Sequence, residues 1–373
     1  MKIRVLHVID HLGFGGAPLV VKGLVEAMPT DRIESVVCAL RPNPRSIAIG
    51  AKVVTLDCHK YSLAAIRAVP RLCEEHGVDI VHAHLQKAVM GTLWATRPGG
   101  CPLIVHEHGP IFRGGTGCIY RAFLKRLGGR ARTIIANSQA AARAMKQVLG
   151  RDDVPVVVVP NSVDLDRFDP ARYEPSAVRS HLGLGDDEFV VGFIGRLDRA
   201  KGADLLIDAA GRLKEQGEPC RVLLFGQGAQ RKTLERQVHS AGLEQSVTFE
   251  GLSENPAEVM RAFDVAVVPS RREAFGIAAL ELMRMKVPVI VSLVGGLPEL
   301  VQPGKTGVIL PELTGAAIAT AIQALRSDPG QREMLASAAF DHAGAFDTQG
   351  PVAQIVGIYE KIMCPQEDQT HHA

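Results

Sequence analysis

Two glutamates separated by seven residues, Glu273 and Glu281, are the strongest candidates for chemistry in this sequence. Glu273 follows the apolar run 265–268 and a short loop, whereas Glu281 lies about two turns inside an apolar helical segment. A carboxylate in such a segment needs a partner, and a ribose or sugar diol that donates two hydrogen bonds is a suitable one. A role as a complement to the helix dipole would explain Glu273 but not Glu281.

Two cations lie in a second loop that carries glycine at each end. Arg196 and Lys201 stand between Gly195 and Gly202, directly after the apolar run 189–194. The planar guanidinium fork of arginine and the point charge of lysine at a helix start suit two adjacent phosphates. Surface Arg and Lys are usually solvated, but the carboxyl end of a parallel strand is where such sheets bind ligands. The pattern therefore favours a diphosphate site.

A glycine-rich turn follows the first apolar run of the chain. Gly13, Gly15 and Gly16 precede a helical segment, where backbone N–H groups can approach an anion. Pro18 occupies the place of the third glycine of a dinucleotide fingerprint, so this turn does not match that motif. The turn could equally well have no ligand and serve only to connect the strand to the helix.

Histidines end two successive apolar runs, as His82-Ala83-His84 and His106-Glu107-His108. Residues i and i+2 of a strand share a face, so either pair could present two imidazoles to a metal. A metal site normally has a carboxylate or further ligands alongside, whereas histidine at a strand end often serves as a hydrogen-bonding group. The pattern favours contact with a substrate over a metal.

These residues must be positioned by short runs of Val, Ile and Leu that alternate with helix-period segments, the pattern of βαβ units. The predicted strands are 3–9, 35–40, 52–56, 80–82, 103–106, 133–136 and 156–159 in a first series, and 189–194, 221–225, 247–249, 265–268, 289–291 and 307–310 in a second. We predict an N-terminal domain over 1–165, a linker over 166–187 and a C-terminal domain over 188–348. Residues 349–373 should form a helix that crosses back to the first domain, and then a polar tail.

Composition narrows the classes of function. The chain has 373 residues, and 42 Lys plus Arg against 40 Asp plus Glu give a formal charge of +2. Near-neutral charge and a single Trp argue against nucleic acid as a partner. Seven scattered cysteines without a C-x-x-C motif predict reduced thiols. No apolar run is long enough to cross a bilayer, and the amino end lacks the apolar core of a signal peptide, so we expect a soluble cytoplasmic protein.

Taken together and in order, the motifs resemble the retaining glycosyltransferases of the family four type, also described as glycosyl transferases group 1, over nearly the whole chain. The resemblance rests on Gly15-Gly16-Ala17, the segment 159–164, Gly195-Arg196 with Lys201-Gly202, Glu273-x7-Glu281 with Phe275-Gly276, and the segment 295–299. It departs at Ser162, where the family usually has glycine. It implies the GT-B fold, an α/β architecture of two doubly wound Rossmann-like domains that face each other across a cleft.

The resemblance also implies a nucleotide-diphosphate sugar donor, UDP- or GDP-linked, held mainly by the second domain. The implied catalytic residues are His108, Arg196, Lys201 and Glu273, and the implied donor-binding residues are Gly15, Gly16, Gly195, Phe275, Gly276, Ile277 and Glu281. Arg196 and Lys201 would contact the diphosphate, Glu281 the ribose, and His108 the donor sugar and the acceptor. Nucleobase contacts would come from the loop 251–255. No metal and no cofactor are expected.

The implied reaction is transfer of a hexose-type sugar, with retention, to an acceptor hydroxyl in the synthesis of a cell-surface glycan, a glycolipid or a small glycoside. A sugar-nucleotide 2-epimerase or hydrolase on the same fold, with the histidine pairs in acid/base work, is an alternative. A third alternative is a binding protein that has lost catalytic activity. The presence of Arg196, Lys201, Glu273 and Glu281 argues against it.

A basic amphipathic segment, 119–127, lies near Arg113, Arg130 and Arg132. The simpler interpretation is the surface helix of an α/β domain. The functional interpretation is that the segment docks to an anionic membrane face. The protein would then be peripheral on the inner membrane face, where it could reach a lipid-linked acceptor.

Overall fold

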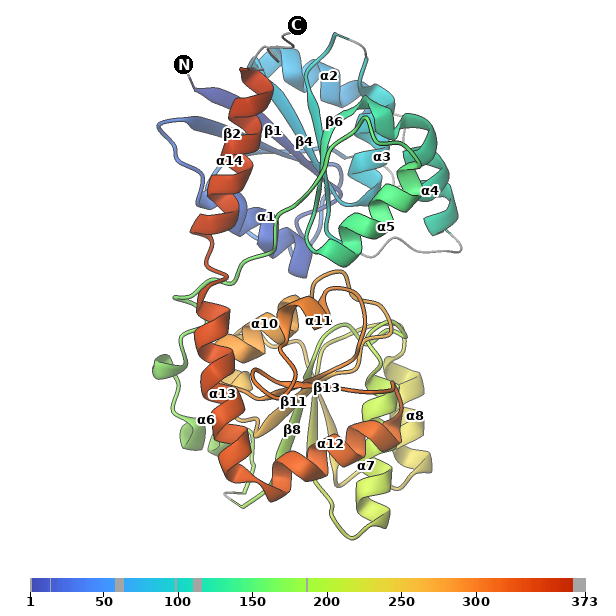
Figure 1. The fold of residues 1–373 in the computed structure, drawn as a ribbon, viewed down its shortest axis with the longest axis vertical. Coiled ribbons are helices and arrows are strands. Elements are labelled where there is room, and N and C mark those ends of the chain that lie inside the picture. The colour runs from blue at the N-terminus through green and yellow to red at the C-terminus, as the bar shows by residue number, and fades with distance from the viewer. Residues whose placement is uncertain are drawn as a thin grey trace, which may run out of the picture. The chain divides into compact units, whose positions relative to one another are not determined.

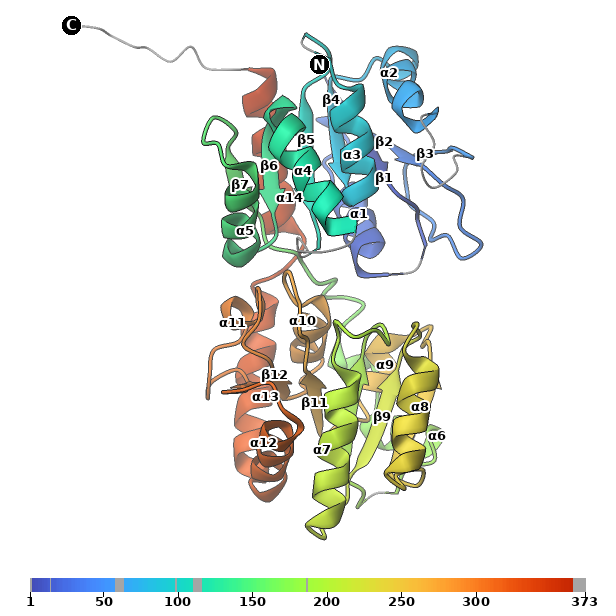
Figure 2. The ribbon, with the colours of Figure 1, turned by 90° about the vertical axis from the view of Figure 1, so that its right-hand side faces the viewer.

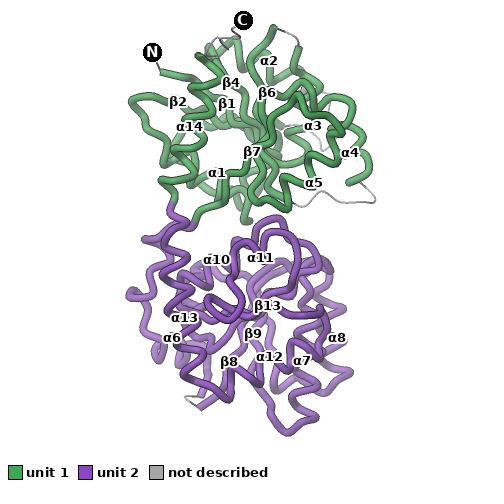
Figure 3. Tube along the Cα trace, in the orientation of Figure 1, with its two compact units in different colours: residues 1–162, 348–373 green, residues 163–347 purple. Residues whose placement is uncertain are grey.

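The computed structural model describes residues 2–13, 15–57, 64–97, 99–109, 116–185 and 187–364. The chain forms two compact units, which Figure 3 colours separately. Unit 1 consists of residues 1–162 and 348–373, and unit 2 consists of residues 163–347. The chain therefore passes from unit 1 into unit 2 and then returns to unit 1. Arg113 and the predicted polar tail, 366–373, lie outside the described residues.

Unit 1 is built on a seven-stranded parallel sheet with the strand order β3-β2-β1-β4-β5-β6-β7. Its strands are β1 (Ile3–Ile9), β2 (Ile33–Ala39), β3 (Lys52–Thr55), β4 (Ile80–His84), β5 (Leu103–Glu107), β6 (Ala131–Ala136) and β7 (Val156–Val158). The chain builds the sheet from β1 toward β3 on one side, and then from β4 toward β7 on the other. The direction of the connections therefore reverses between β1 and β4.

Helices cover both faces of this sheet (Figure 1). Helices α1 (Gly16–Glu26) and α14 (Gln349–Met363) pack on one face, and α2 (Ala64–His76), α3 (Gln86–Ala95), α4 (Thr116–Leu127) and α5 (Gln139–Leu149) pack on the other. Figure 2 shows α3 and α4 on one side of the sheet and α14 on the other. Leu6 and Val8 enter the core beneath α2 to α5, whereas Val5 enters the core beneath α14. Burial of both faces explains why the strands are continuous apolar runs.

Helix α14 follows unit 2 in the sequence and completes the core of unit 1. Its apolar residues Val352, Ile355, Val356 and Tyr359 follow the spacing of one helix face. All four are buried against the sheet. The Tyr359 hydroxyl also hydrogen-bonds to Nδ1 of His82 at 2.6 Å, so α14 contributes one polar contact within an otherwise apolar layer.

Unit 2 has a six-stranded parallel sheet with the corresponding order β10-β9-β8-β11-β12-β13. Its strands are β8 (Val190–Ile194), β9 (Arg221–Phe225), β10 (Val247–Gly251), β11 (Val265–Val268), β12 (Val289–Val291) and β13 (Val308–Ile309). Helices α6 (Pro175–His181), α9 (Pro256–Met260), α10 (Ile277–Arg284), α11 (Leu297–Leu300) and α13 (Pro329–Gly344) contribute to the core on one face, and α7 (Ala203–Glu215), α8 (Arg231–Ser240) and α12 (Gly315–Ser327) to the core on the other.

The segment 166–187, predicted as a linker, instead lies inside unit 2. It contains the short helix η2 (Pro170–Arg172) and helix α6. Phe168, Val178 and Leu184 from this segment are buried in the core of unit 2. The polar, turn-rich composition of this segment therefore comes from short helices and the turns between them. The segment is part of unit 2 and does not connect the two units.

The predicted strands are all present, and their ends move by one or two residues at most. The prediction of two doubly wound parallel α/β units is confirmed. Runs 80–82 and 103–106 extend to His84 and Glu107, because polar residues at the carboxyl end of these strands still pair in the sheet. Among the described residues, no helix is both long enough and apolar enough to cross a membrane.

Removal of buried volume from α14 should destabilise unit 1. Ile355 is 1% exposed in the core beneath α14, so Ile355→Ala should lower the free energy of unfolding by about 2–5 kcal/mol. Urea unfolding followed by the fluorescence of Trp94, the single tryptophan and a residue of unit 1, measures this change. Met334→Ala, at a position 51% exposed on α13 of unit 2, is the control and should leave the Trp94 transition unchanged.

Candidate active site

Unit 2 brings three loops together at the carboxyl edge of its sheet. The loops 195–202, 269–276 and 292–296 follow β8, β11 and β12, which are neighbours in the sheet. The direction of the connections reverses between β8 and β11, and parallel sheets bind ligands at the carboxyl ends beside such a point. The predicted site residues of the second half lie in the first two of these loops or in helix α10.

Lys201 and Glu273 are in direct contact although they are 72 positions apart in the sequence. The Lys201 Nζ donates to Oε2 of Glu273 at 2.6 Å, and the Ser270 hydroxyl donates to the same oxygen at 3.3 Å. The two side chains are 23% and 13% exposed, so solvent screens this pair less than it screens a surface ion pair. The ammonium group has three N–H donors, and two remain for an anion.

A second ion pair fixes the two loops against each other. The Arg271 guanidinium donates to both carboxylate oxygens of Asp204, each at 2.6 Å, and the Arg271 backbone N–H donates to the Ala200 carbonyl at 2.7 Å. The third loop is joined by the Ser292 hydroxyl, which donates to the Ser270 carbonyl at 2.6 Å. These bonds lie on either side of Lys201 and Glu273, and they fix the backbones of the three loops relative to one another.

Two glycines allow the loops to approach this closely. Gly202 has φ +73°, and a Cβ there would lie 2.0 Å from the carbonyl oxygen of Pro269. Gly295 has φ +59°, and a Cβ there would lie 1.7 Å from the carbonyl oxygen of Glu273. Any side chain at either position would push the neighbouring loop away, and the left-handed backbone would be strained as well.

Helix α10 begins at the same edge, at the predicted Phe275-Gly276-Ile277 segment. Gly276 is the N-cap residue and supplies no side-chain cap, so the first N–H groups of α10 are left for another acceptor. The Phe275 ring is 5% exposed and packs at 6.1 Å from the Phe346 ring, between ring centroids. Phe275 therefore faces the core of unit 2 and can meet a ligand only through its backbone.

Glu281 lies on α10 between the buried residues Leu280 and Leu282. Burial raises the pKa of its carboxyl to about 7, and the charge of Arg167 offsets this only in part. A carboxylate in this position is unfavourable unless a ligand donates hydrogen bonds to it.

Arg196 differs from Lys201 in its surroundings. Its side chain is 73% exposed, and it forms an ion pair with Asp198 at 3.1 Å. Gly195, before it, is held by a bond from its backbone N–H to the Phe225 carbonyl at 3.0 Å. The structure therefore places Arg196 in the predicted loop but on its exposed side, where it is free to reorient toward an anion.

In unit 1, the predicted glycines lie at the start of α1. Gly15 is the N-cap residue with extended backbone, Gly16 is the first residue of the helix, and no side chain caps this end. The first turn holds no acidic residue. The end of α1 therefore offers free N–H groups to an anion, and the role of Gly15 and Gly16 in binding one stays a prediction.

The predicted His108 belongs to a row of five imidazoles on three neighbouring strands, with His7 on β1, His82 and His84 on β4, and His106 and His108 at the end of β5. His84 links two of them: its Nδ1 lies 3.0 Å from Nε2 of His108, and its Nε2 lies 3.1 Å from Nδ1 of His7. Sequence patterns identified the two pairs but missed His7, which stands alone within an apolar run.

Burial holds these imidazoles in the neutral form. The pKa of His7 falls to about 3 and that of His108 to about 4, in both cases because burial disfavours the charged ring. His108 can therefore donate or accept one hydrogen bond at neutral pH but carries no charge there.

Two acids at the same edge of unit 1, the half-buried Asp10 and the buried Glu107, were not predicted as site residues. Asp10 follows β1 and accepts a bond from the Ala88 N–H at 2.7 Å, and burial raises its pKa. Glu107 ends β5, accepts a bond from the Tyr120 hydroxyl at 2.7 Å, and has a pKa raised to about 7 by burial. Their place at strand ends is the signal that could have found them.

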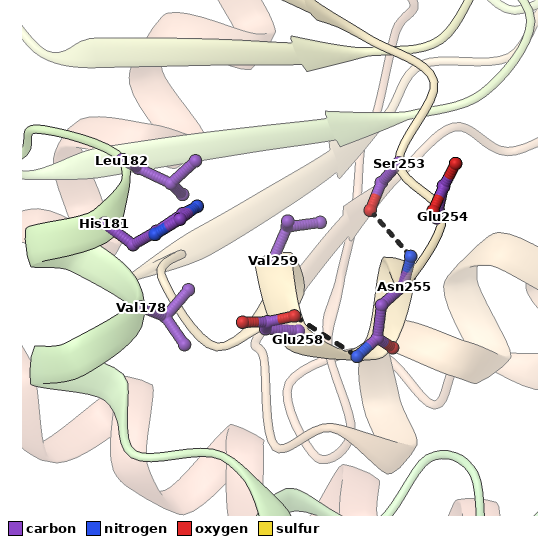
Figure 4. Close-up of a pocket in the computed structure, with 8 residues that line it drawn as sticks. All are labelled: Val178, His181, Leu182, Ser253, Glu254, Asn255, Glu258 and Val259. Carbon is purple, nitrogen blue, oxygen red and sulfur yellow. Dashed lines mark hydrogen bonds between the residues drawn. The ribbon is translucent and has the colours of Figure 1, made fainter.

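A separate pocket of about 340 Å³ lies in unit 2 between α6 and the segment 253–259 (Figure 4). Within it, the backbone N–H of Asn255 donates to Ser253 Oγ at 3.2 Å, and the side-chain amide of Asn255 donates to Glu258 Oε2 at 3.2 Å. Ser253 and Asn255 belong to the predicted nucleobase loop. None of the predicted catalytic residues lines this pocket, so we do not assign it to the reacting groups.

The raised pKa of Glu281 predicts a dependence of stability on pH. Between pH 4.5 and about 7 the folded protein holds a proton at Glu281 that the unfolded chain has lost, so the stability contributed by this group falls as pH rises. Glu281→Gln should therefore be more stable than the parent by roughly 1–3 kcal/mol at pH 8, with little difference at pH 4. Urea unfolding followed by circular dichroism measures this, with the exposed Glu333→Gln as the control. Equal stability of parent and Glu281→Gln at pH 8 would contradict the burial cost.

Two family models match successive parts of the chain. The model described as Glycosyltransferase Family 4 matches residues 14–167, and that described as Glycosyl transferases group 1 matches residues 176–342. A D-inositol 3-phosphate glycosyltransferase of Geodermatophilus obscurus is 36% identical over 237 residues, 61% of this chain and 52% of that protein. An alpha-D-kanosaminyltransferase of Streptomyces kanamyceticus is 32% identical over 202 residues, 53% of this chain and 52% of that protein. The matched region thus spans about half the length of these relatives.

Solved structures match almost the whole chain. The Anabaena protein HepE in complex with UDP and glucose is 25% identical, covers 96% of this chain and 100% of its own, and has a TM-score of 0.82. A sucrose-phosphate synthase from Thermosynechococcus elongatus is 22% identical, covers 97% and 99%, and has a TM-score of 0.86, which shows likeness of fold. With two sheets of corresponding strand order and both family models matched in sequence, the chain belongs to the family four glycosyltransferases of the GT-B type.

Proposed function

We propose that this protein is a retaining glycosyltransferase that moves a hexose-type sugar from a nucleoside diphosphate to an acceptor hydroxyl. The observation that carries the proposal is the contact of Lys201 with Glu273 at the carboxyl edge of the unit 2 sheet, beside the uncapped start of α10. This arrangement offers a fixed cation and free N–H groups to a diphosphate, and a carboxylate to the hydroxyls of a sugar.

The proposed donor is a sugar linked to UDP or GDP, with UDP-glucose as the first to test. Support for a uridine nucleotide comes from the Anabaena protein, which is described in complex with UDP and glucose. Within unit 2, Lys201 and Arg196 would bind the diphosphate and Glu281 would accept bonds from the ribose hydroxyls. A ligand that donates two hydrogen bonds to Glu281 offsets the cost of its burial, which links nucleotide binding to this carboxylate.

The proposed reaction needs no protein nucleophile. The acceptor hydroxyl attacks on the face from which the diphosphate leaves, and a leaving-group oxygen takes the hydroxyl proton. The positive charge that develops on the sugar ring is countered by the departing diphosphate, and Lys201 with the α10 N–H groups stabilises the negative charge that grows on that diphosphate. These groups are fixed before reaction by the Glu273 and Arg271 contacts, so little reorganisation is required.

His108 and the two glycines of α1 are the proposed contributions of unit 1. The neutral His108 ring would hydrogen-bond to hydroxyls of the donor sugar or acceptor, and Gly15 and Gly16 would offer N–H groups to the diphosphate. D-inositol 3-phosphate is an acceptor to test first, because relatives over 30% identical carry its name.

A sugar-nucleotide 2-epimerase or hydrolase is the alternative to transfer. Incubation of UDP-glucose without acceptor distinguishes these reactions. An epimerase yields a new isomer, and a hydrolase releases glucose as fast without acceptor as with it, whereas a transferase hydrolyses UDP-glucose only slowly. Proton NMR of the anomeric centre after reaction with an acceptor reports retention. We also propose that transfer requires no metal, and activity lost after exhaustive chelation and regained with Mg²⁺ would contradict this.

Removal of either member of the Lys201 and Glu273 pair should abolish most transfer. Lys201→Ala and Glu273→Ala should each lower turnover about 10²- to 10³-fold, because Lys201 stabilises the leaving diphosphate and Glu273 holds Lys201 in position. The double variant should lose little more than either single variant, since the two side chains act through one contact. Release of UDP from UDP-glucose in the presence of acceptor measures turnover.

Lys232→Ala on α8 is the matched control for loss of a lysine in unit 2 and should keep the parent turnover. Circular dichroism of each variant separates loss of activity from loss of fold. Parent turnover in either Lys201→Ala or Glu273→Ala would exclude the assigned site.

We also propose that unit 1 docks to an anionic membrane surface through α4 and the end of α3. Trp94 and Ile119 are 56% and 59% exposed, and the Trp94 ring lies 5.7 Å from the Phe123 ring, between centroids. Lys125 and Arg126 are exposed on α4, the helix that also carries Ile119 and Phe123. Exposed apolar side chains beside cations are the combination that binds the headgroup region of anionic lipid.

Vesicle binding tests this surface. Vesicles with anionic phosphatidylglycerol should shift the emission of Trp94 to shorter wavelength, and salt should weaken the effect, because screening reduces attraction to the charged lipid. Lys125→Glu with Arg126→Glu should abolish binding, whereas Lys232→Glu with Arg236→Glu on α8 of unit 2 should not. Equal binding to neutral phosphatidylcholine vesicles, or no shift at all, would rule out the proposal.

A further inference from the structure

The five imidazoles of unit 1 form a group that the proposed transfer does not use as a whole. Register pairs His7 with His82 across β1 and β4, and His84 with His106 across β4 and β5. Ring centroids of neighbouring members lie 4.1 to 5.5 Å apart. Four of the five are buried, and His108 is the partly exposed member. The group therefore extends from the core beneath α14 to the carboxyl edge of the sheet.

Half of the ring nitrogens in this group have no hydrogen-bond partner among the described residues. The unpartnered atoms are Nε2 of His7, Nε2 of His82, both nitrogens of His106, and Nδ1 of His108. A buried polar atom without a partner costs about 1–3 kcal/mol, and His106 carries two such atoms, so a species bound beside His84 and His108 could satisfy one of them. Imidazole nitrogens that converge are ligands for a borderline transition-metal ion.

Three members already have the spacing of a coordination site. Each of His84, His106 and His108 offers one ring nitrogen within 4.8 Å of the others. His84 Nδ1 and His108 Nε2 are 3.0 Å apart, close to the ~3.3 Å edge of a tetrahedron with zinc–nitrogen distances of about 2.05 Å. An ion between these two atoms would replace a single hydrogen bond, and a ring nitrogen of His106 lies within 4.8 Å of both.

His7 would support this site from outside. When Nδ1 of His84 binds an ion, its Nε2 carries the ring proton, and Nδ1 of His7 lies 3.1 Å away as an acceptor. Metal-bound histidine normally donates its second N–H in this way, which fixes the tautomer and the orientation of the ring. The second possible set, His7, His82 and His84, is buried throughout, whereas His108 gives the first set an entry from solvent.

We propose that His84, His106 and His108 bind one Zn²⁺ ion at the carboxyl edge of the unit 1 sheet. Three imidazoles leave the fourth tetrahedral position open to water or to an oxygen of a ligand. The ion engages Nε2 of His108, the side chain that we place at the donor sugar, so zinc competes with that role and inhibits transfer. Binding of zinc itself does not depend on the proposed function.

The experiment is titration of the full chain, first stripped with a chelator and then freed of it, with Zn²⁺ in a calorimeter. One ion should bind per chain, and Co²⁺ should give the visible absorption of a four-coordinate nitrogen site. Mg²⁺, which prefers oxygen ligands, should not bind there. A parent chain that takes up no stoichiometric zinc would overturn the proposal.

His106→Phe is the sharpest variant, because both ring nitrogens of His106 lack partners and an apolar ring of similar shape should let the chain fold. It should lose the zinc site and the cobalt spectrum, and His106→Gln should repeat this result if the larger ring disturbs packing. His7→Phe should weaken binding about 10- to 100-fold, because it removes the outer acceptor.

Histidines elsewhere supply the controls. Replacement of His371 and His372 by Ala, or of the exposed His239 by Ala, should leave binding intact. Loss of zinc in the His371 and His372 variant, or its retention in both His106 variants, would show that the ion sits elsewhere and would overturn the assignment. Loss in His82→Phe with retention in His106→Phe would place the ion in the second set and would also overturn it.

Discussion

The contact of Lys201 with Glu273 depends on a property of parallel sheets, in which every strand ends at the same edge. β8 and β11 are neighbours although β9 and β10 separate them in the chain, so the loops after them meet. Arg271 and Asp204 then fix these loops, and Gly202 and Gly295 allow their backbones to touch. An acid and a base that are far apart in sequence thus become one unit with a fixed position. The rigidity of the edge, more than any single residue, makes a preorganised anion site possible.

Charge placement follows from the same architecture. The carboxyl edges collect groups that are costly to bury, such as Glu281 in unit 2 and Asp10 and Glu107 in unit 1. Burial raises the pKa of these acids, which means that their ionised forms lower the free energy of unfolding. A group that destabilises the empty protein and is satisfied by a polar ligand is what a binding site requires. The net charge of +2 hides this arrangement, because it sums over the whole chain.

Much of the fold could be read from the sequence, because strands buried on both faces are continuous apolar runs, as 3–9 and 265–268 illustrate. The loop glycines and the spacing of Glu273 and Glu281 likewise carry local signals. Contacts between distant segments carry none: the hydrogen bond from Lys201 to Glu273 and the row of imidazoles arise only when strands pair. His7 was missed because one histidine in an apolar run has no periodic partner. The segment 166–187 was mistaken for a linker because three buried apolar residues are too few to stand out among polar turns.

The return of the chain to unit 1 through α14 makes unit 2 an insertion within unit 1. During synthesis, β1 to β7 emerge first, but the helix that covers Val5, Ile80 and Ile104 emerges only after all of unit 2. One face of the first sheet is therefore incompletely covered while some 185 residues are made, the span of 163–347. Such a sheet exposes apolar surface in an unfinished chain, where association with other chains competes with folding. The order of folding is thereby reversed: the unit that is synthesised first is completed last.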